Sequence, residues 1–211
     1  MKILSLIFPL MLLSVPLATH AEIMPPDELI KTTVNDVLEI IKQDKRTKVA
    51  GNKEILEFID AKILPHFNFE RMTKLAVARD WRVATPEQKL ALTVEFRTML
   101  VRTYSKALTL YKDISVEIKP VVIVPSVDEV TVKTVILRPG APPVPVDYEM
   151  EKTATGWKAF DVTVEGISLV ATHRESFKQK VQQSGIDGLI QSLSELNKSA
   201  ANPPVNKAEA K

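Results

Sequence analysis

The strongest constraint on the fold is a change in the spacing of apolar residues along the chain. Up to about Asp113 they recur every three or four positions, from Ile114 to Val164 they alternate with polar residues, and after Gly166 the helical spacing returns. Helices, then one block of strands, then helices again are typical of the α+β class, because a parallel α/β fold needs helices between its strands. The 211 residues are enough for one domain with its own core.

Four helices are expected before the strands. The first opens at Pro25–Asp27 and ends by Gly51, the second covers residues 53–64, and the third begins near Asn68, a suitable N-cap. The fourth and longest runs from residue 85 to residue 111. It begins with a capping box, Thr85–Gln88, that has proline at the first helical position.

Four strands are expected next, each with apolar residues at alternate positions. The short polar or glycine-containing connections between them favour an antiparallel meander. One apolar face and one polar face predict a sheet covered by helices on one side only, and the long helix 85–111 is the natural cover. The alternating apolar positions are Ile114, Val116 and Ile118; Val130, Val132 and Ile136; Val144, Val146, Tyr148 and Met150; and Phe160, Val162 and Val164.

The end of the chain reads as helix followed by tail. A helix is expected from Gly166 to Gly185, where the glycine is a plausible C-terminal cap, and a short helix with Leu189, Leu193 and Leu196 follows. Residues 198–211 contain almost no apolar side chain and are predicted to be a disordered tail. The folded domain is therefore expected to span residues 22–197.

The first 21 residues resemble a cleaved secretory signal peptide. Lys2 precedes an apolar run from Ile3 to Ala18, and Ala21 suits the position before the cut. The alternative interpretation is an N-terminal membrane anchor, although the run is short for a membrane span. The chain has no cysteine, so neither a lipid-modified cysteine nor a disulfide is expected.

Charge and motifs exclude several classes of function. The formal net charge of +2 makes nucleic acid an unlikely partner. His66 and His173 lack metal-ligand spacing, and no nucleophile elbow or phosphate-binding glycine loop occurs, so no enzyme, metal or cofactor is expected. Asp161, in the middle of a strand, is interpreted as solvent-side polarity, as a hydrogen-bonded anchor or, least favoured, as a general acid.

Several segments together resemble a known family, the MlaC or toluene tolerance family of periplasmic phospholipid carriers. They are the run from Arg71 to Ala78 with the following Trp81, the helix start at residues 84–88, Phe96 and residues 104–111 on the long helix, the strand 156–162, the segment 165–170, and residues 185–189. The resemblance rests on their order and spacing and extends from about residue 26 to residue 196.

The resemblance implies a fold similar to the nuclear transport factor 2 (NTF2)-like class, in which a twisted antiparallel sheet and helices enclose an apolar lipid pocket. It implies a soluble periplasmic shuttle for diacyl phospholipid that maintains outer-membrane lipid asymmetry. The implied protein partners are an outer-membrane lipoprotein–porin complex and the MCE-domain ring of an inner-membrane ABC transporter. Transport direction is not readable from the sequence of a carrier.

Two sets of residues are candidates for these roles. Expected to line the pocket, although ordinary core packing explains each singly, are Leu75, Trp81, Met99, Tyr104, Leu108, Val116, Val132, Val146, Tyr148, Val162, Val164, Ile167 and Val170. Expected to form a cationic docking rim, unless they are only a solvated helix face, are Arg71, Lys74, Arg79 and Arg82.

Two rival functions remain open. The first is a periplasmic adaptor or chaperone that binds proteins through its helical face without a lipid ligand. The second is an enzyme of the same general fold that uses Asp161 with Tyr148 or His173.

Overall fold

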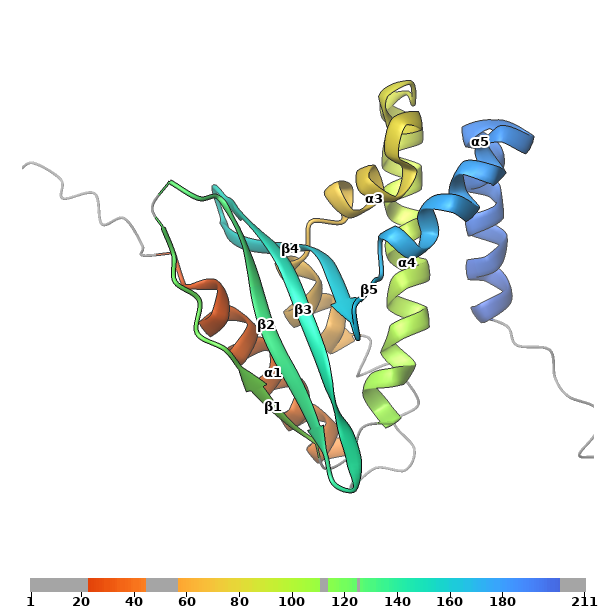
Figure 1. The fold of residues 1–211 in the computed structure, drawn as a ribbon. Coiled ribbons are helices and arrows are strands. Elements are labelled where there is room, and N and C mark those ends of the chain that lie inside the picture. The colour runs from red at the N-terminus through yellow and green to blue at the C-terminus, as the bar shows by residue number, and fades with distance from the viewer. Residues whose placement is uncertain (1–22, 45–56, 111–113, 125, 202–211) are drawn as a thin grey trace, which may run out of the picture.

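The computed structural model in Figure 1 describes residues 23–44, 57–110, 114–124 and 126–201. It contains one antiparallel sheet with helices, which confirms the α+β class. The expected signal peptide and residues 202–211 of the expected tail lie outside the described residues.

The strands follow one another in the order β1-β2-β3-β4-β5, so the expected antiparallel meander is confirmed. The fifth strand was not expected, because residues 166–170 read as the start of a helix. Glu165 and Gly166 both have positive φ angles, 51° and 83°, and they reverse the chain so that β5 pairs with β4. The strands are β1 Ser115–Ile118, β2 Glu129–Arg138, β3 Ala141–Thr153, β4 Gly156–Val164 and β5 Ile167–Ser168.

A β-bulge in β4 changes which of its side chains share a face. Glu149 pairs with Asp161, but the next residue of β3, Met150, pairs with Ala159, so Phe160 is the extra residue. Because side chains alternate along a strand, Ala159 and Val162 then point to the same side and Phe160 to the other. The expectation that Phe160 shares a face with Val162 is therefore wrong.

The helices are close to those expected. Of the second expected helix, the structure describes residues 57–64, where residues 57 and 58 are helical and are followed by a π-helical turn and the start of a 3-10 turn. The helical elements are α1 Pro26–Asp44, η1 Ile59–Ile63, η2 Leu64–His66, α3 Phe69–Val77, η3 Ala78–Arg82, α4 Pro86–Leu110, η4 Ala171–His173 and α5 Arg174–Ala201.

Local sequence signals fix two of the helix starts. The Thr85 hydroxyl accepts a hydrogen bond from the Gln88 amide, and the Gln88 side chain accepts one from the Thr85 amide, which confirms the capping box. Asn68 caps α3, because its side-chain oxygen accepts a hydrogen bond from the Arg71 amide.

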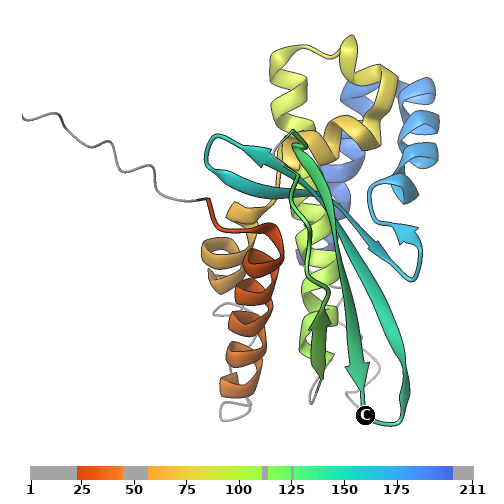
Figure 2. The same ribbon diagram turned by 60° about the vertical axis from the view of Figure 1, so that its left-hand side comes forward.

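The arrangement of the helices corrects one expectation. α1 packs directly against β1 and β2, whereas the long helix α4 packs mainly against α3 and α5. Figure 2 shows α1 and α4 on the same side of the sheet, with the C-terminal ends of both helices at the same end of the molecule as the β2–β3 hairpin. We call the side of the sheet that these helices face the inner face.

α5 is interrupted at Gly185, which has φ 72° and ψ −178°. Glycine adopts this conformation readily because it has no Cβ atom, whereas other residues rarely do. The expected helix end at Gly185 and the short helix after it are therefore found as two segments with a break. The second segment continues to Ala201, beyond residue 198, where the sequence predicts the tail to start.

Apolar side chains form two main cores. One lies among the helices and is called the helical core; it comprises Met72, Ala76, Val77, Trp81, Leu92, Phe96, Met99, Leu100, Val170, Phe177, Leu189 and Leu193. The other joins α1 to the inner face of the sheet, around Ile30, Val132, Met150, Trp157 and Ala159. Phe67 packs against both cores and links them.

Candidate functional site

The inner face of the sheet is an apolar ladder assembled from neighbouring strands. Val132 of β2 lies opposite Tyr148 of β3, which lies opposite Val162 of β4. The next row toward the hairpin places Val146 opposite Val164. The structure thus brings together six expected pocket residues on one face: Val116, Val132, Val146, Tyr148, Val162 and Val164.

Burial decreases along this face toward the hairpin. Val132 and Met150 have no exposed surface, whereas Val116, Ile136 and Val144, which share a row near the hairpin, are only half-buried. A sheet face closed by a packed core would be buried along its whole length. The hairpin half of the inner face is therefore apolar but not filled by the described side chains.

Helix α1 shows the same gradient. Ile30, near its start, is buried in the core that α1 shares with the sheet, and Val34, one turn later, is only half-buried. Val37 and Leu38 continue the apolar spacing toward the hairpin end and are also half-buried. The facing surfaces of α1 and the sheet thus open toward the same end of the molecule.

Tyr148 lies in the middle of the inner face. Burial raises the pKa of its phenol to about 12, because the charged form would lose its hydration. Its side chain nevertheless keeps accessible surface and counts as half-buried. Tyr148 is therefore largely desolvated while part of its surface stays accessible on the inner face.

Five other expected pocket residues lie elsewhere. Trp81, Met99 and Val170 are buried in the helical core, and Leu75 and Tyr104 pack against it. For these five residues the ordinary alternative, core packing, is what the structure supports. Burial also raises the pKa of Tyr104, which marks its position at the inner margin of the helical core.

Two further expected residues need separate description. Ile167 lies on β5 opposite Val164, which places it on the inner face at the edge of the sheet, with 63% of its surface exposed, and its place in the pocket stays a prediction. Leu108 belongs to α4, but its side chain lies outside the described residues.

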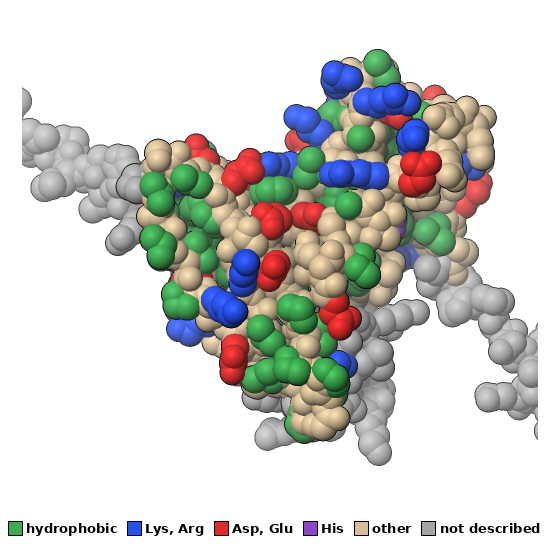
Figure 3. Space-filling model, in the orientation of Figure 1, with side chains coloured by type: hydrophobic (Ala, Val, Ile, Leu, Met, Phe, Trp, Pro, Cys, Tyr) green, Lys and Arg blue, Asp and Glu red, His purple; other side chains and the backbone are tan. Residues whose placement is uncertain are grey.

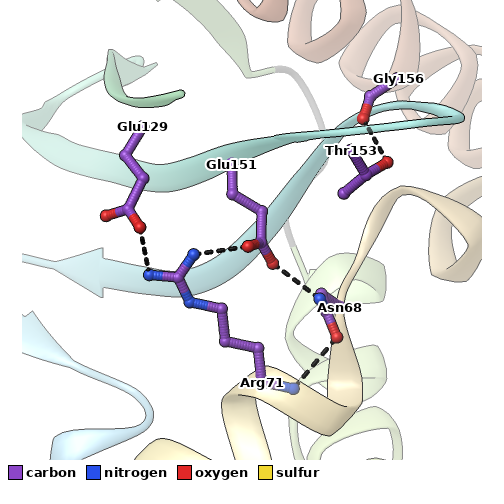
Figure 4. Close-up of polar contacts among 6 residues, drawn as sticks. All are labelled: Asn68, Arg71, Glu129, Glu151, Thr153 and Gly156. Atoms are coloured by element: carbon purple, nitrogen blue, oxygen red, sulfur yellow. Dashed lines mark hydrogen bonds and ion pairs between the residues drawn. The ribbon is translucent and has the colours of Figure 1, made fainter. Parts of the chain in front are cut away.

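Arg71, expected in the docking rim, is instead held in a polar cluster on the outer face of the sheet (Figure 4). Its guanidinium donates to Glu151 at 2.5 Å and to Glu129 at 2.6 Å, and it lies 3.6 Å above the centre of the Phe160 ring. The side-chain amide of Asn68 donates to the second Glu151 oxygen at 2.6 Å. This cluster, hereafter the Arg71 clasp, fastens the start of α3 to β2, β3 and β4.

Opposing effects act on the charge of Arg71. Partial burial disfavours the charged guanidinium, but the hydrogen bonds that it donates to Glu129 and Glu151 outweigh that effect and raise its pKa. Arg71 therefore stays charged and paired, and it is not a free cation for a partner.

The remaining three cations of the expected rim are exposed. Lys74 lies on α3, and Arg79 and Arg82 lie on η3. Within the described part of the chain, none of the three has an ion-pair partner. Figure 3 shows Lys and Arg side chains gathered at the end of the molecule where α3 and the start of α4 lie.

The residues of the enzyme hypothesis do not form a constellation. The Asp161 carboxylate accepts hydrogen bonds from the Val162 and Val170 amides and from the Ser168 hydroxyl, at 2.8, 3.2 and 2.5 Å. It is the hydrogen-bonded anchor of the β4–β5 turn. Tyr148 points to the opposite face of the sheet from Asp161.

His173, the third residue of that hypothesis, lies in the helical region. Its ring stacks on Phe177 and meets the edge of Phe96, with centroid distances of 5.4 and 5.3 Å. Burial lowers its pKa, and its Nε2 atom is buried without a hydrogen-bond partner in the part of the chain that is described. Its surroundings are those of a packed aromatic side chain.

Sequence reasoning missed two contributors to the inner face. Trp157 is buried there, but the bulge at Phe160 separates it from the alternation of Val162 and Val164. Val34, Val37 and Leu38 of α1 follow helical spacing, but that spacing carries no signal for the surface that they meet.

None of the helices in the described part of the chain is both long and apolar enough to cross a membrane. No group of three or more His, Asp or Glu side chains there is arranged to hold a metal ion.

Comparisons with known proteins agree with one another. The family model described as MlaC protein matches residues 31–195. The toluene tolerance protein ttg2D of Pseudomonas putida is 23% identical over 204 residues, which are 92% of this chain and 93% of that protein. A phospholipid-binding protein from Ralstonia solanacearum, solved in complex with a phospholipid, has a TM-score of 0.76 and 33% identity, over 84% of this chain and 99% of that one.

Proposed function

This chain belongs to the MlaC family, and from that premise we propose that it is a periplasmic phospholipid carrier. It is exported by a cleaved signal peptide, residues 1–21, and diffuses between the two membranes. It exchanges lipid with an outer-membrane lipoprotein–porin complex and with the MCE-domain ring of an inner-membrane ABC transporter. In this way it maintains the lipid asymmetry of the outer membrane, without a catalytic step.

The physical requirement on such a carrier is to hide acyl chains from water. Two acyl chains carry on the order of 30 methylene groups, and at about 0.8 kcal/mol each their exposure would cost roughly 24 kcal/mol. A dry apolar surface meets this requirement without specific polar contacts. Selectivity for the headgroup is therefore expected to be weak.

We place the acyl chains against the hairpin half of the inner face, between the sheet, α1 and α4. The apolar side chains that are only half-buried gather there, and Tyr148 is both desolvated and partly accessible. The proposed lining comprises the half-buried Val34, Val37, Leu38, Val116, Tyr148 and Val164, with Leu108 of α4 as a further candidate. Val132, Val146 and Val162 are buried beside them on the same face.

The observation that carries the proposal is this underfilled apolar face in a fold whose solved relative holds a phospholipid. The test is to purify the chain without residues 1–21 from the bacterial periplasm, extract it with organic solvent and identify lipids by mass spectrometry. We expect about one diacyl phospholipid or more per protein. A purified protein that contains no lipid, and takes none from phospholipid vesicles, would contradict the proposal and favour a protein-binding adaptor.

We further propose that Lys74, Arg79 and Arg82 contact acidic surfaces of the protein partners, with Arg71 removed from the original set. Unpaired exposed cations accelerate encounter with an acidic partner, and salt screens the effect. The double change Arg79→Glu and Arg82→Glu should slow lipid delivery to the purified MCE ring at low salt, while the lipid content stays unchanged. If the double variant delivers lipid at the wild-type rate at every salt concentration, these cations form only a solvated helix face.

A further inference from the structure

Exposed apolar side chains are concentrated in one place on the surface. Six of the eleven large hydrophobic side chains that are exposed in the described part of the chain come from two short segments. Val122 is the most exposed of all eleven, at 87%. The six, hereafter the edge patch, are Ile23, Met24, Val122, Ile123, Val124 and Val127.

The two segments lie near each other. Residues 23–25 lead into α1, and the Val121 amide donates a hydrogen bond to the Asp27 carboxylate in the first turn of that helix, at 3.2 Å. Figure 3 shows hydrophobic side chains along this edge of the molecule, over the connection between β1 and β2. A contiguous exposed apolar patch of this kind marks an interaction site more often than a scattered apolar residue does.

The edge patch is continuous with the apolar core beneath the sheet. Val121 packs against the core that contains Val132 and Met150, and Tyr148 packs against the same core. The neighbouring Val122 then points into solvent. An apolar path therefore runs from the surface of the edge patch to the inner face on which the lipid is proposed to lie.

The charge beside the edge patch favours an anionic lipid surface. The six side chains of the patch are aliphatic or Met. Two exposed lysines, Lys119 and Lys133, lie next to it, where the Lys119 amide donates to the Lys133 carbonyl. Neither lysine has an ion-pair partner among residues that the structure describes.

We propose that the edge patch contacts the surface of an anionic phospholipid bilayer while the protein takes up or releases lipid; this inference rests on the proposed carrier function. Val122, Ile123 and Val124 enter the interfacial region, and Lys119 and Lys133 reach anionic headgroups. Short apolar insertions flanked by lysine bind such surfaces through buried apolar area and electrostatic attraction together.

The acidic residues nearby are compatible with this orientation. The Asp27 carboxylate is engaged with the Val121 amide. Asp128 is exposed beside Val127, and Asp147 lies opposite Lys133 in the β2–β3 pair, so both carboxylates must stay in water when Val122, Ile123 and Val124 enter the interface. The contact is expected to be weak and reversible, as a shuttle requires, because only a few side chains enter the interface.

The test is co-sedimentation of the lipid-loaded protein with vesicles of phosphatidylethanolamine and phosphatidylglycerol, and with vesicles of phosphatidylcholine alone. Wild-type protein should bind the anionic vesicles. The double change Val122→Asp and Ile123→Asp should lower that binding at least tenfold. Lys119→Glu should weaken binding to the anionic vesicles and leave binding to phosphatidylcholine unchanged.

Leu90→Asp is the matched control, because Leu90 is an exposed aliphatic residue, 67% accessible, on α4 away from the edge patch. It should bind vesicles like wild type, and all variants should keep the wild-type melting temperature. Absence of vesicle binding by the wild type, or equal loss in the control, overturns the proposal. A further result would also overturn the proposal. If the double variant still binds vesicles but no longer delivers lipid to the MCE ring in an assay without vesicles, the edge patch contacts a protein.

Lipid analysis of the same samples separates the two proposals. A protein that carries phospholipid but does not bind vesicles retains the proposed function and refutes the membrane contact. A protein that binds vesicles through Val122 and Ile123 but carries no phospholipid refutes the carrier function and retains the membrane contact.

Discussion

The helical core and the hairpin half of the inner face are both apolar, but the helical core is buried and the hairpin half of the inner face is only half-buried. Phe96 and Leu92 of α4 have no exposed surface, and Phe96 packs edge-on to Phe177 with ring centroids 5.2 Å apart. On the inner face, Val116, Tyr148 and Val164 all keep accessible surface. A filled core contributes stability, whereas an underfilled apolar face can accept a ligand whose own chains complete the packing.

The largest expected difference between the two regions comes from removing an aromatic ring. Phe96→Ala should lower the free energy of unfolding by about 3–5 kcal/mol, because the ring leaves a cavity in a packed core. The loss from Tyr148→Ala should be smaller than the loss from Phe96→Ala by ~1 kcal/mol or more, because the site of Tyr148 is already partly open. Urea unfolding of lipid-free protein measures both. An equal or larger loss for Tyr148→Ala would contradict the idea that the inner face is underfilled.

The second expected effect concerns the clasp that joins the two regions. Arg71→Met should destabilise the protein by about 1–3 kcal/mol, because Glu151, with 18% of its side chain exposed, loses a charged partner. Arg97→Met is the control, since Arg97 pairs with Asp60 where both side chains are largely exposed, and it should cost less than about 1 kcal/mol. Equal losses in urea unfolding would mean that Arg71 does not fasten α3 to the sheet.

Local signals account for what the sequence predicted well. The capping box at Thr85, the N-cap at Asn68 and the break at Gly185 depend on residues a few positions apart, and the alternation of apolar residues determined the meander. Six of the expected pocket residues share the inner face because strand periodicity also acts locally.

Long-range contacts account for what the sequence could not predict. Arg71 is 80 residues from Glu151 and 58 from Glu129 along the chain, so nothing near Arg71 distinguishes a clasp from a solvated cation. The bulge at Phe160 depends on how β4 pairs with β3, and the alternation of β4 alone does not reveal it. Helix amphipathicity gave α4 an apolar face but could not tell whether helices or the sheet would cover it.

A smaller stability effect, with a large effect on ligand, is expected on the inner face. Val164→Asn places a polar group where acyl chains are proposed to lie, which should cost about 1–3 kcal/mol of lipid affinity and so reduce bound lipid several-fold or more. Val135→Asn is the matched control, because Val135 is also a half-buried valine but lies on the outer face. Lipid per protein is measured by mass spectrometry. Similar lipid loss in both variants would remove the assignment of the inner face.

The smallest expected effect is the pH dependence contributed by the helical core. Burial lowers the pKa of His173 below its ordinary value of 6.5, and burial and then Lys158 lower that of His66. As pH falls through 6.5, the unfolded chain binds protons that the native histidines do not, so stability falls on acidification. His173→Phe keeps an aromatic ring between Phe96 and Phe177 and removes the titrating group.

The measurement is the urea midpoint of wild type, His173→Phe and His66→Gln at pH 7.5 and at pH 5.5. His173→Phe should lose less stability than wild type over this interval, because the buried Nε2 atom of the wild type must either stay neutral or be protonated without a partner. His66→Gln should remove the remaining histidine contribution. If His173→Phe and wild type lose the same stability on acidification, His173 is hydrated in the native state, and the helical core is open to water at this point.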